Sequence, residues 1–168
     1  MKPVIYSPTP HEIVKKMLDM AKINNNDIVY DLGCGDGRIL ISAIKDFGAQ
    51  KAIGYEIRGD LCSTARDEIQ KLHLNEYIKV FNSDFLEADL AGCSVLTLYL
   101  SNEATELLRP KLQKELRSGS RVICYAYRMN LWKVTKEVEL QQPYYANRKF
   151  VEMLYLYHVP DAYNRMGE

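Results

Sequence analysis

Three alternating glycines stand directly after an apolar run that ends near an acidic residue. Residues 29–41 read VYDLGCGDGRILI, in which Asp31 precedes Gly33, Gly35 and Gly37. An apolar helical pattern follows the last glycine. A glycine-rich turn between a strand and a helix lets the backbone approach a bound ligand closely. The residue types and spacing of this turn therefore predict a site for a nucleotide-like cofactor.

The glycine spacing disfavours a dinucleotide cofactor. The fingerprint G-x-G-x-x-G has its third glycine where this chain has Arg38, and that glycine lets the helix pack closely under a pyrophosphate. A pyrophosphate is bound by amide donors at a helix N-terminus, whereas here Asp31 precedes the turn and Asp36 lies within it. Carboxylates suit a ligand with an ammonium group. The turn therefore favours S-adenosylmethionine, whose amino-acid end carries one, over NAD.

Further acids follow the next two expected strands. Glu56 lies in the segment IGYEI, and a carboxylate at the carboxyl end of a strand can accept both hydroxyls of a ribose. Ile57 is then expected against one face of the adenine. In the segment NSDF, Asp84 is expected to accept from the adenine amino group and Phe85 to pack beside the ring.

Each of these residues alone has an ordinary structural interpretation. A glycine-rich turn is often only a tight turn, and a lone acid at a strand end is usually solvated or part of a turn. Together, however, acids end three successive expected strands. Because open α/β sheets bind ligands at the carboxyl ends of their strands, the combination favours an S-adenosylmethionine site.

Strands and helices alternate along most of the chain, which predicts a doubly wound, mostly parallel α/β sheet. The segment 94–100 is almost wholly apolar, as expected for a central strand that is covered on both faces. The expected strands of this part are 27–32, 51–57, 77–81, 94–100 and 121–127, with helices that begin near residues 10, 38, 60 and 101.

Capping residues predict where several helices begin. Thr9 and Glu12 form the pattern of a capping box at the first helix. Asp60 and Ser101 are expected to cap two later helices, and Pro110 to kink or restart the second of them.

The last third of the chain breaks the alternation. Only residues 128–133 separate the fifth expected strand from the segment 134–140, which is too short for a helical crossover. The segments 134–140 and 150–157 are therefore expected to form an antiparallel hairpin that closes one sheet edge, with a turn at 143–147. Its aromatic residues could stack nucleic-acid bases, but packing within the hairpin is the interpretation that we favour.

Length and charge predict a single domain without a polyanionic partner. The 168 residues are expected to form one domain, with an N-terminal segment and helix (1–26), a cofactor-binding core (27–127) and a C-terminal hairpin and tail (128–168). With 22 basic and 22 acidic residues, the formal net charge is zero, which argues against nucleic acid as the main partner.

Metal and membrane sites are not expected. The 4 cysteines contain no C-x-x-C pair and the 3 histidines are scattered, so we predict no metal site and small buried thiols in a reducing compartment. No apolar run approaches the ~20 residues of a membrane-spanning helix. A cytoplasmic protein without a membrane partner is expected, and a monomer is the default.

The order VYDLGCGDGR, IGYEI, NSDF and VLTLYL resembles the class I S-adenosylmethionine-dependent methyltransferases over residues 27 to about 127. The segment YSPTP at residues 6–10 extends the likeness. It makes the chain similar to the archaeal-type protein-lysine methyltransferases and their mitochondrial relatives, which have Tyr-Val-Pro-Thr-Pro, so Ser7 is a departure. The resemblance implies a Rossmann-like methyltransferase fold and methylation of lysine ammonium groups on proteins.

The site residues follow from this resemblance and from the chemistry of the segments above. The residues expected to bind the cofactor are Thr9, Asp31, Gly33, Gly35, Gly37, Arg38, Glu56, Ile57, Asp84, Phe85 and Leu100.

Tyr6 and Asn102 are the expected catalytic residues. The fourth strand ends in YLSN at residues 99–102, where the transferred methyl group should point. This segment lacks the Asn/Asp-Pro-Pro-aromatic pattern that holds planar amino groups, so a flexible amine is favoured as the acceptor. The phenol of Tyr6 could hold that amine and its ring could face a cation, although Tyr6 could equally be a packing residue.

Three other functions compete with protein-lysine methylation. The same fold could methylate RNA or a small molecule. A cofactor-binding module without catalysis is disfavoured, because such a domain has no physical need for the complete set of glycines and acids. An NAD-dependent oxidoreductase is excluded by the bulky Arg38 and by the short chain.

Overall fold

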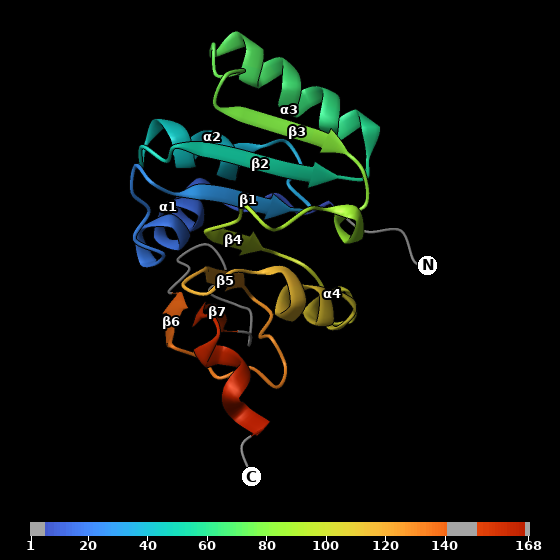
Figure 1. The fold of residues 1–168 in the computed structure, drawn as a ribbon. Helices are drawn as coiled ribbons and strands as arrows, with labels where there is room; N and C mark the ends of the chain where they lie inside the picture. The colour runs from blue at the N-terminus through green and yellow to red at the C-terminus, as the bar shows by residue number, and fades with distance from the viewer. Residues whose placement is uncertain (1–5, 141–150, 167–168) are drawn as a thin grey trace.

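The computed structural model describes residues 6–140 and 151–166, which form one seven-stranded sheet with helices on both faces (Figure 1). The strands are β1 (Ile28–Leu32), β2 (Lys51–Glu56), β3 (Ile78–Asn82), β4 (Val95–Leu98), β5 (Arg121–Tyr125), β6 (Lys136–Leu140) and β7 (Glu152–His158). The α-helices are α1 (His11–Met20), α2 (Arg38–Lys45), α3 (Gly59–Lys71) and α4 (Asn102–Glu115), and the 3-10 helices are η1 (Phe85–Glu87) and η3 (Asp161–Met166).

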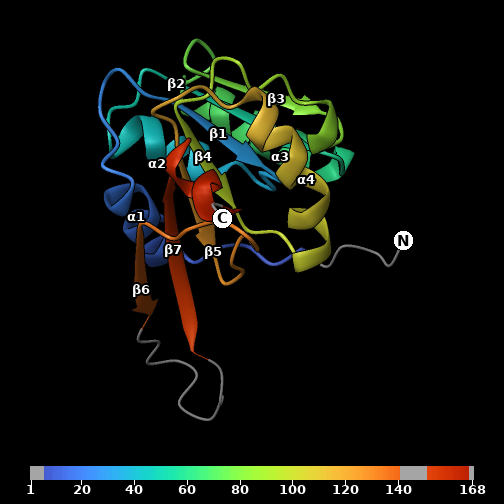
Figure 2. The same ribbon diagram turned by 60° about the horizontal axis from the view of Figure 1, so that its bottom comes forward.

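The strand order is β3-β2-β1-β4-β5-β7-β6. The first five strands pair in parallel, whereas β7 is antiparallel to both β5 and β6. This arrangement confirms the doubly wound sheet with an antiparallel C-terminal hairpin, which occupies the lower end of the sheet in Figure 1. β7 lies between β5 and β6 (Figure 2), a placement that the sequence pattern left open. The turn expected at 143–147 lies outside the described residues.

Apolar side chains pack on both faces of the sheet. One cluster joins the strands to α1, α2 and α3, with Met17 and Leu40 fully buried. The other joins them to α4 and to the segment after β5, with Leu108 and Trp132 fully buried. Every residue of β4 is buried, which confirms its central position. Burial of each large apolar side chain contributes about 1.5–3 kcal/mol to folding.

Two of the predicted helix caps are wrong. Pro10 is the N-cap of α1 without a side-chain cap, and the backbone carbonyl of Thr9 instead accepts from the Arg38 guanidinium. The N-cap of α3 is Arg58, and Asp60 pairs with its side chain. In both places the N-cap is a different residue from the predicted one, Pro10 in place of Thr9 and Arg58 in place of Asp60. Ser101 is confirmed as a cap, because its Oγ accepts from the Ala104 amide at 3.3 Å.

Pro110 was expected to kink or restart the helix, and the structure shows no restart there. α4 runs continuously from Asn102 to Glu115 with Pro110 inside it. The buried residues Leu108 and Leu112 flank this position and hold both halves of the helix against the same core. Packing therefore maintains the helix where Pro110 removes a backbone donor.

Gly54 lets β2 pass close to the glycine turn. A Cβ at this position would lie 2.6 Å from both Cys34 Sγ and Leu40 Cδ1. The turn is also bound directly to β2, because the amides of Gly33 and Cys34 donate to the Tyr55 carbonyl at 2.8 and 3.1 Å. The absence of a side chain at Gly54 thus fixes how closely the turn sits on the sheet.

Gly54→Ala should lower the free energy of unfolding by about 1–3 kcal/mol, the usual cost of overpacking a core. Urea unfolding measures this directly. Gly92→Ala is the matched control, since its Cβ would lie an ordinary 3.4 Å from the Tyr30 hydroxyl. Equal losses in the two variants would contradict the close contact at Gly54.

Candidate active site

The glycine turn between β1 and α2 requires its glycines for two reasons. Gly33, Gly35 and Gly37 have φ angles of 83°, 54° and 80°, in the left-handed region that side chains rarely adopt. A Cβ on Gly35 would lie 2.7 Å from the Tyr6 ring, and one on Gly33 would lie 3.2 Å from Leu100 Cδ2. The bare backbone of the turn therefore faces the two residues that were predicted to border the transferred methyl group.

Asp31 is a buried carboxyl group beside this turn. It is 3% exposed near the end of β1, and the Thr97 hydroxyl donates to its Oδ1 at 2.9 Å. Burial raises the pKa of Asp31 to about 7, against the Thr97 hydrogen bond, and the nearby carboxylates of Glu56 and Asp36 raise it further. A cation placed here would stabilise the ionised carboxylate. Asp31 is therefore suited to an ammonium group.

Glu56 joins the end of β2 to the glycine turn. Its Oε2 accepts from the Gly35 amide at 2.9 Å, and its Oε1 accepts from the Arg58 amide at 2.9 Å. The residue is 7% exposed. Because an ionised carboxylate has about four acceptor sites, these two bonds leave capacity for further donors such as ribose hydroxyls.

The acids expected at three strand ends do lie at one edge of the sheet. β3, β2 and β1 are neighbours, so Asp84, Glu56 and Asp31 follow one another along the carboxyl ends of these strands. Asp84 caps η1 by accepting from the Leu86 amide at 2.8 Å. Phe85 is half-buried against the core, whereas Ile57 is 63% exposed and offers an apolar surface beside Glu56.

Asn102 differs from the other predicted site residues in its surroundings. It is the exposed first residue of α4, and its carbonyl accepts from the Thr105 hydroxyl at 2.8 Å. Tyr6 and Leu100 contact the glycine turn directly, but Asn102 lies beyond them at the helix start.

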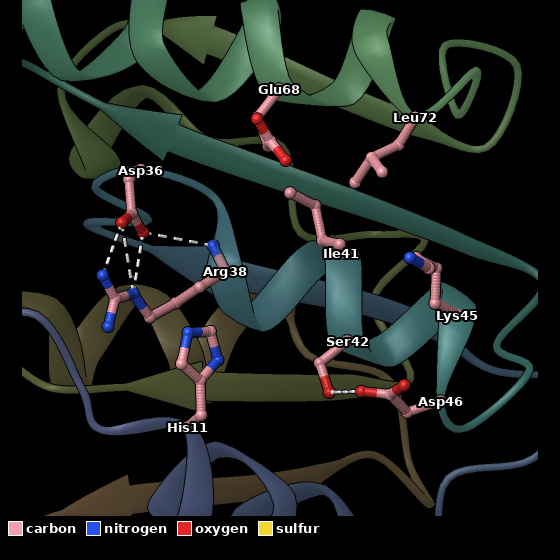
Figure 3. Close-up of a pocket in the computed structure, with 9 residues that line it drawn as sticks. All are labelled: His11, Asp36, Arg38, Ile41, Ser42, Lys45, Asp46, Glu68 and Leu72. Atoms are coloured by element: carbon pink, nitrogen blue, oxygen red, sulfur yellow. Dashed lines mark hydrogen bonds and ion pairs between the residues drawn. The ribbon is translucent and has the colours of Figure 1, made fainter.

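Arg38 and Thr9 contact each other. The guanidinium of Arg38 forms a two-pronged ion pair with Asp36, and its Nη1 donates to the Thr9 carbonyl at 3.0 Å. Figure 3 shows the Arg38–Asp36 pair beside His11, at one end of a groove that α2 forms with its neighbours. Burial alone would raise the pKa of Asp36, but Arg38 outweighs it and holds this pKa below its ordinary value. Asp36 therefore stays ionised, and the positive charge of Arg38 compensates its negative charge.

Two features of the site escaped the sequence analysis. Thr97, which donates to Asp31, is the one polar residue between apolar neighbours in VLTLYL, and this signal could have identified it. The other feature is that Tyr99 and Tyr125 lie with their ring centroids 4.5 Å apart and their ring planes tilted by 37°, and the Tyr125 hydroxyl donates to Glu152 Oε2 at 2.7 Å. The Tyr125–Glu152 bond depends on the pairing of β5 with β7, so no local signal predicts it.

The structure also bears on metal sites and on the thiols. Within residues 6–140 and 151–166, no group of three or more His, Cys, Asp or Glu side chains is arranged to hold a metal ion. All four cysteines are free and buried, as predicted. No helix in this part of the chain is long and apolar enough to span a membrane.

The buried carboxyl of Asp31 and the bare backbone at Gly33 and Gly35 fit the ammonium end of S-adenosylmethionine. Glu56 retains acceptor capacity for the ribose. Together with the sheet order, these features are typical of a Rossmann-like methyltransferase, in which the carboxyl edge of the parallel strands is the expected place for the cofactor.

Comparison with known proteins specifies the class further. The model of the ANTKMT methyltransferase domain matches residues 31–136. A protein-lysine N-methyltransferase from Saccharolobus islandicus (strain REY15A) is 39% identical over 138 residues, which are 82% of this chain and 86% of that protein. An adenine nucleotide translocase lysine N-methyltransferase from Mus musculus is 31% identical over 61% of this chain, which spans only 44% of the mouse protein.

A solved structure agrees with this assignment. An RNA methyltransferase from Salinibacter ruber, in complex with S-adenosyl-L-homocysteine, has a TM-score of 0.84 and 32% identity. The likeness covers 92% of this chain and 95% of that one. The chain therefore belongs to the ANTKMT methyltransferase family, and it is an S-adenosylmethionine-dependent methyltransferase.

Asp31→Asn should make the protein more stable at alkaline pH. The folded pKa of about 7 exceeds the ordinary 3.8, so the folded state binds this proton more tightly than the unfolded state. The resulting stability is complete below about pH 4 and is lost as the pH rises to about 7. The variant has no carboxyl group to ionise at this position, so its free energy of unfolding at pH 8 should be higher than that of the wild type.

Urea unfolding at pH 5 and pH 8 measures the difference. Asp60→Asn is the control, because Asp60 is exposed and Arg58 lowers its pKa. Identical pH dependence of the wild type and Asp31→Asn would show that the pKa of Asp31 is not raised.

Proposed function

We propose that this enzyme methylates lysine side-chain amines of proteins by direct transfer from S-adenosylmethionine. The observation that carries the proposal is the 39% identity to a protein-lysine N-methyltransferase, which extends over 82% of this chain and 86% of that relative. The mouse relative is also named as a lysine N-methyltransferase. The segment YLSN after β4, which lacks the Asn/Asp-Pro-Pro-aromatic pattern for planar amino groups, also favours a flexible amine acceptor.

The residues at the carboxyl edge of the sheet would hold the cofactor. Asp31 would accept from its ammonium group and Glu56 from its ribose hydroxyls, while Asp84 and Phe85 would contact the adenine. The amides of Gly33 and Gly35 already donate to the Tyr55 carbonyl and to the Glu56 carboxylate, so they would shape the turn rather than bind the cofactor directly. When bound, S-adenosylmethionine supplies a methyl group on a sulfonium, a good leaving group for one in-line displacement. No covalent enzyme intermediate is needed.

The acceptor side must align a neutral amine. The amine nitrogen forms a bond to the methyl carbon as the carbon–sulfur bond breaks, and the sulfur keeps that electron pair. Lysine has a pKa near ~10.4 in water, so it must lose a proton first. Partial desolvation beside Leu100 and the Tyr6 ring would lower that pKa and release the proton to solvent. Tyr6 would thus orient the amine, and alignment would provide most of the catalysis.

RNA is the second candidate acceptor, because the Salinibacter ruber structure is named as an RNA methyltransferase. Two observations on this chain favour protein instead. Trp132 and Tyr157 are fully buried and pack edge to face at 5.6 Å, so neither ring can stack on a base. The formal net charge is also zero.

We also propose that the enzyme acts as a monomer in the cytoplasm. The four cysteine thiols are unpaired and buried, which fits a reducing compartment. Sedimentation at micromolar concentration tests the oligomeric state.

An acceptor assay tests the proposed function. The purified chain and S-adenosylmethionine with a labelled methyl group are incubated with cell extract divided into protein, RNA and small-molecule fractions. We expect label in protein that hydrolysis recovers as methyl-lysine. Label in RNA or metabolites would overturn the lysine acceptor while retaining methyl transfer.

Asp31→Asn should weaken S-adenosylmethionine binding and abolish a proton release. At pH 6 the free carboxyl is mostly protonated, since its pKa is about 7. An ammonium partner lowers that pKa, so binding should expel a proton from the wild type. Calorimetry in two buffers of different ionisation enthalpy measures this proton. A proton release of the same size in the variant would show that Asp31 does not contact the ammonium group.

Tyr6→Phe should lower kcat on the order of ten-fold while cofactor affinity stays constant, because it removes the phenol but keeps the ring. Tyr77→Phe is the matched control, since Tyr77 is 48% exposed and precedes β3 at the opposite edge of the sheet. Steady-state kinetics and calorimetry give the two quantities. Equal kcat values in Tyr6→Phe and the wild type would make Tyr6 a packing residue.

A further inference from the structure

We propose that Arg38 is a positioning residue that, together with Asp36, fastens the N-terminal segment across the glycine turn and so places Tyr6 over Gly35. The "N-terminal strap" denotes residues 6–9. The inference rests on the role proposed for Tyr6 in methyl transfer, and it assigns to Arg38 a part other than cofactor contact.

The contacts of Arg38 reach both sides of the junction. Nε and Nη2 donate to Asp36 Oδ1 and Oδ2 at 2.9 and 2.6 Å, which anchors the guanidinium on the glycine turn itself. Nη1 donates to the Thr9 carbonyl at 3.0 Å, which holds the end of the strap. A planar guanidinium can make these three bonds at once, whereas a lysine ammonium cannot reproduce the fork.

The other end of the strap rests on the same turn. The Tyr6 ring lies so close to Gly35 that an added Cβ would come within 2.7 Å of its Cε2. The Tyr6 hydroxyl also interacts with the Asp36 carboxylate, and burial, followed by this carboxylate, raises the pKa of Tyr6. Asp36 is therefore shared between the strap and Arg38, and the three side chains form one network.

Burial makes this network more than a surface ion pair. The side chains of Arg38 and Asp36 are 23% and 25% exposed, and Thr9 is 5% exposed. Exposed ion pairs usually contribute little, because solvent screens them. Hydrogen bonds in partly buried networks are stronger and reinforce one another.

The same chain contains a matched pair that lacks the strap. Arg58 and Asp60 have the same spacing and the same fork, with Nη2 to Oδ2 at 2.6 Å. Their side chains are 43% and 66% exposed at the start of α3. Arg58→Gln keeps the backbone amide that donates to Glu56. The variant therefore removes an arginine–aspartate fork but leaves the hydrogen bond from Arg38 to the strap intact.

The position of the strap can be measured without any acceptor. Ser7 is exposed in the strap, and the four native cysteines are buried, with thiol pKa values that burial raises. A spin label on Ser7→Cys therefore reports strap mobility by electron paramagnetic resonance. We expect greater mobility when Arg38→Gln is added, and no change when Arg58→Gln is added. Unchanged mobility with Arg38→Gln would overturn the proposal.

Kinetics test whether Arg38 acts through Tyr6. Arg38→Gln should lower kcat on the order of ten-fold, because it removes a charged hydrogen bond that orders a catalytic side chain. The affinity for S-adenosylmethionine should change by less than about three-fold. In a Tyr6→Ala background the same substitution should have little further effect, because the residue that it positions is gone. Fully additive losses would show that Arg38 acts by another route.

The outcomes separate this inference from the proposed function. If the wild type methylates RNA instead of protein, the lysine proposal fails while strap mobility and its kinetic coupling remain measurable on the RNA acceptor. If Arg38→Gln chiefly weakens S-adenosylmethionine binding, with strap mobility unchanged, Arg38 contacts the cofactor and the positioning role is refuted. A thermal midpoint similar to that of Arg58→Gln excludes general unfolding as the cause.

Discussion

The hydrogen bond from the Gly35 amide to the Glu56 carboxylate joins the two parts on which the site depends. Gly35 belongs to the turn after β1, and Glu56 ends β2, so the bond forms only in the observed parallel register, in which Leu32 lies opposite Tyr55. A slip of one residue would turn Glu56 to the other face of the sheet. Gly54 keeps the two elements close enough for the contact. The geometry of the cofactor edge is thus a consequence of strand pairing.

Stability and function oppose each other at this edge. Asp31 and Glu56 are buried carboxyl groups near each other, and neither the Thr97 hydroxyl nor the turn amides carry a full compensating charge. A folded chain without ligand therefore retains an electrostatic cost at the site that we propose binds the ammonium group of the cofactor. Costs of this kind concentrate at functional sites, because ligand binding removes them.

The glycine spacing, the apolar run of β4 and the acids at strand ends sufficed to predict the fold and the cofactor from sequence, while the residues that hold the cofactor stay a prediction. These signals are local: periodicity, turn residues and strand composition. The failures came from contacts between distant segments. At Thr9, where a side-chain cap was expected, the backbone carbonyl accepts from Arg38, 29 residues away, and Pro10 is the N-cap of α1. Likewise, the bond from Tyr125 to Glu152 exists only because β7 pairs with β5.

The order of the last strands has a consequence for assembly during synthesis. β6 leaves the ribosome before β7, yet its strand partner in the described sheet is β7, which lies between it and β5. A nascent chain that ends after β6 therefore exposes the unpaired edge of β5 and an orphaned β6. Open strand edges invite pairing with other chains. The last strand to emerge both completes the sheet and protects the growing chain from association through β5.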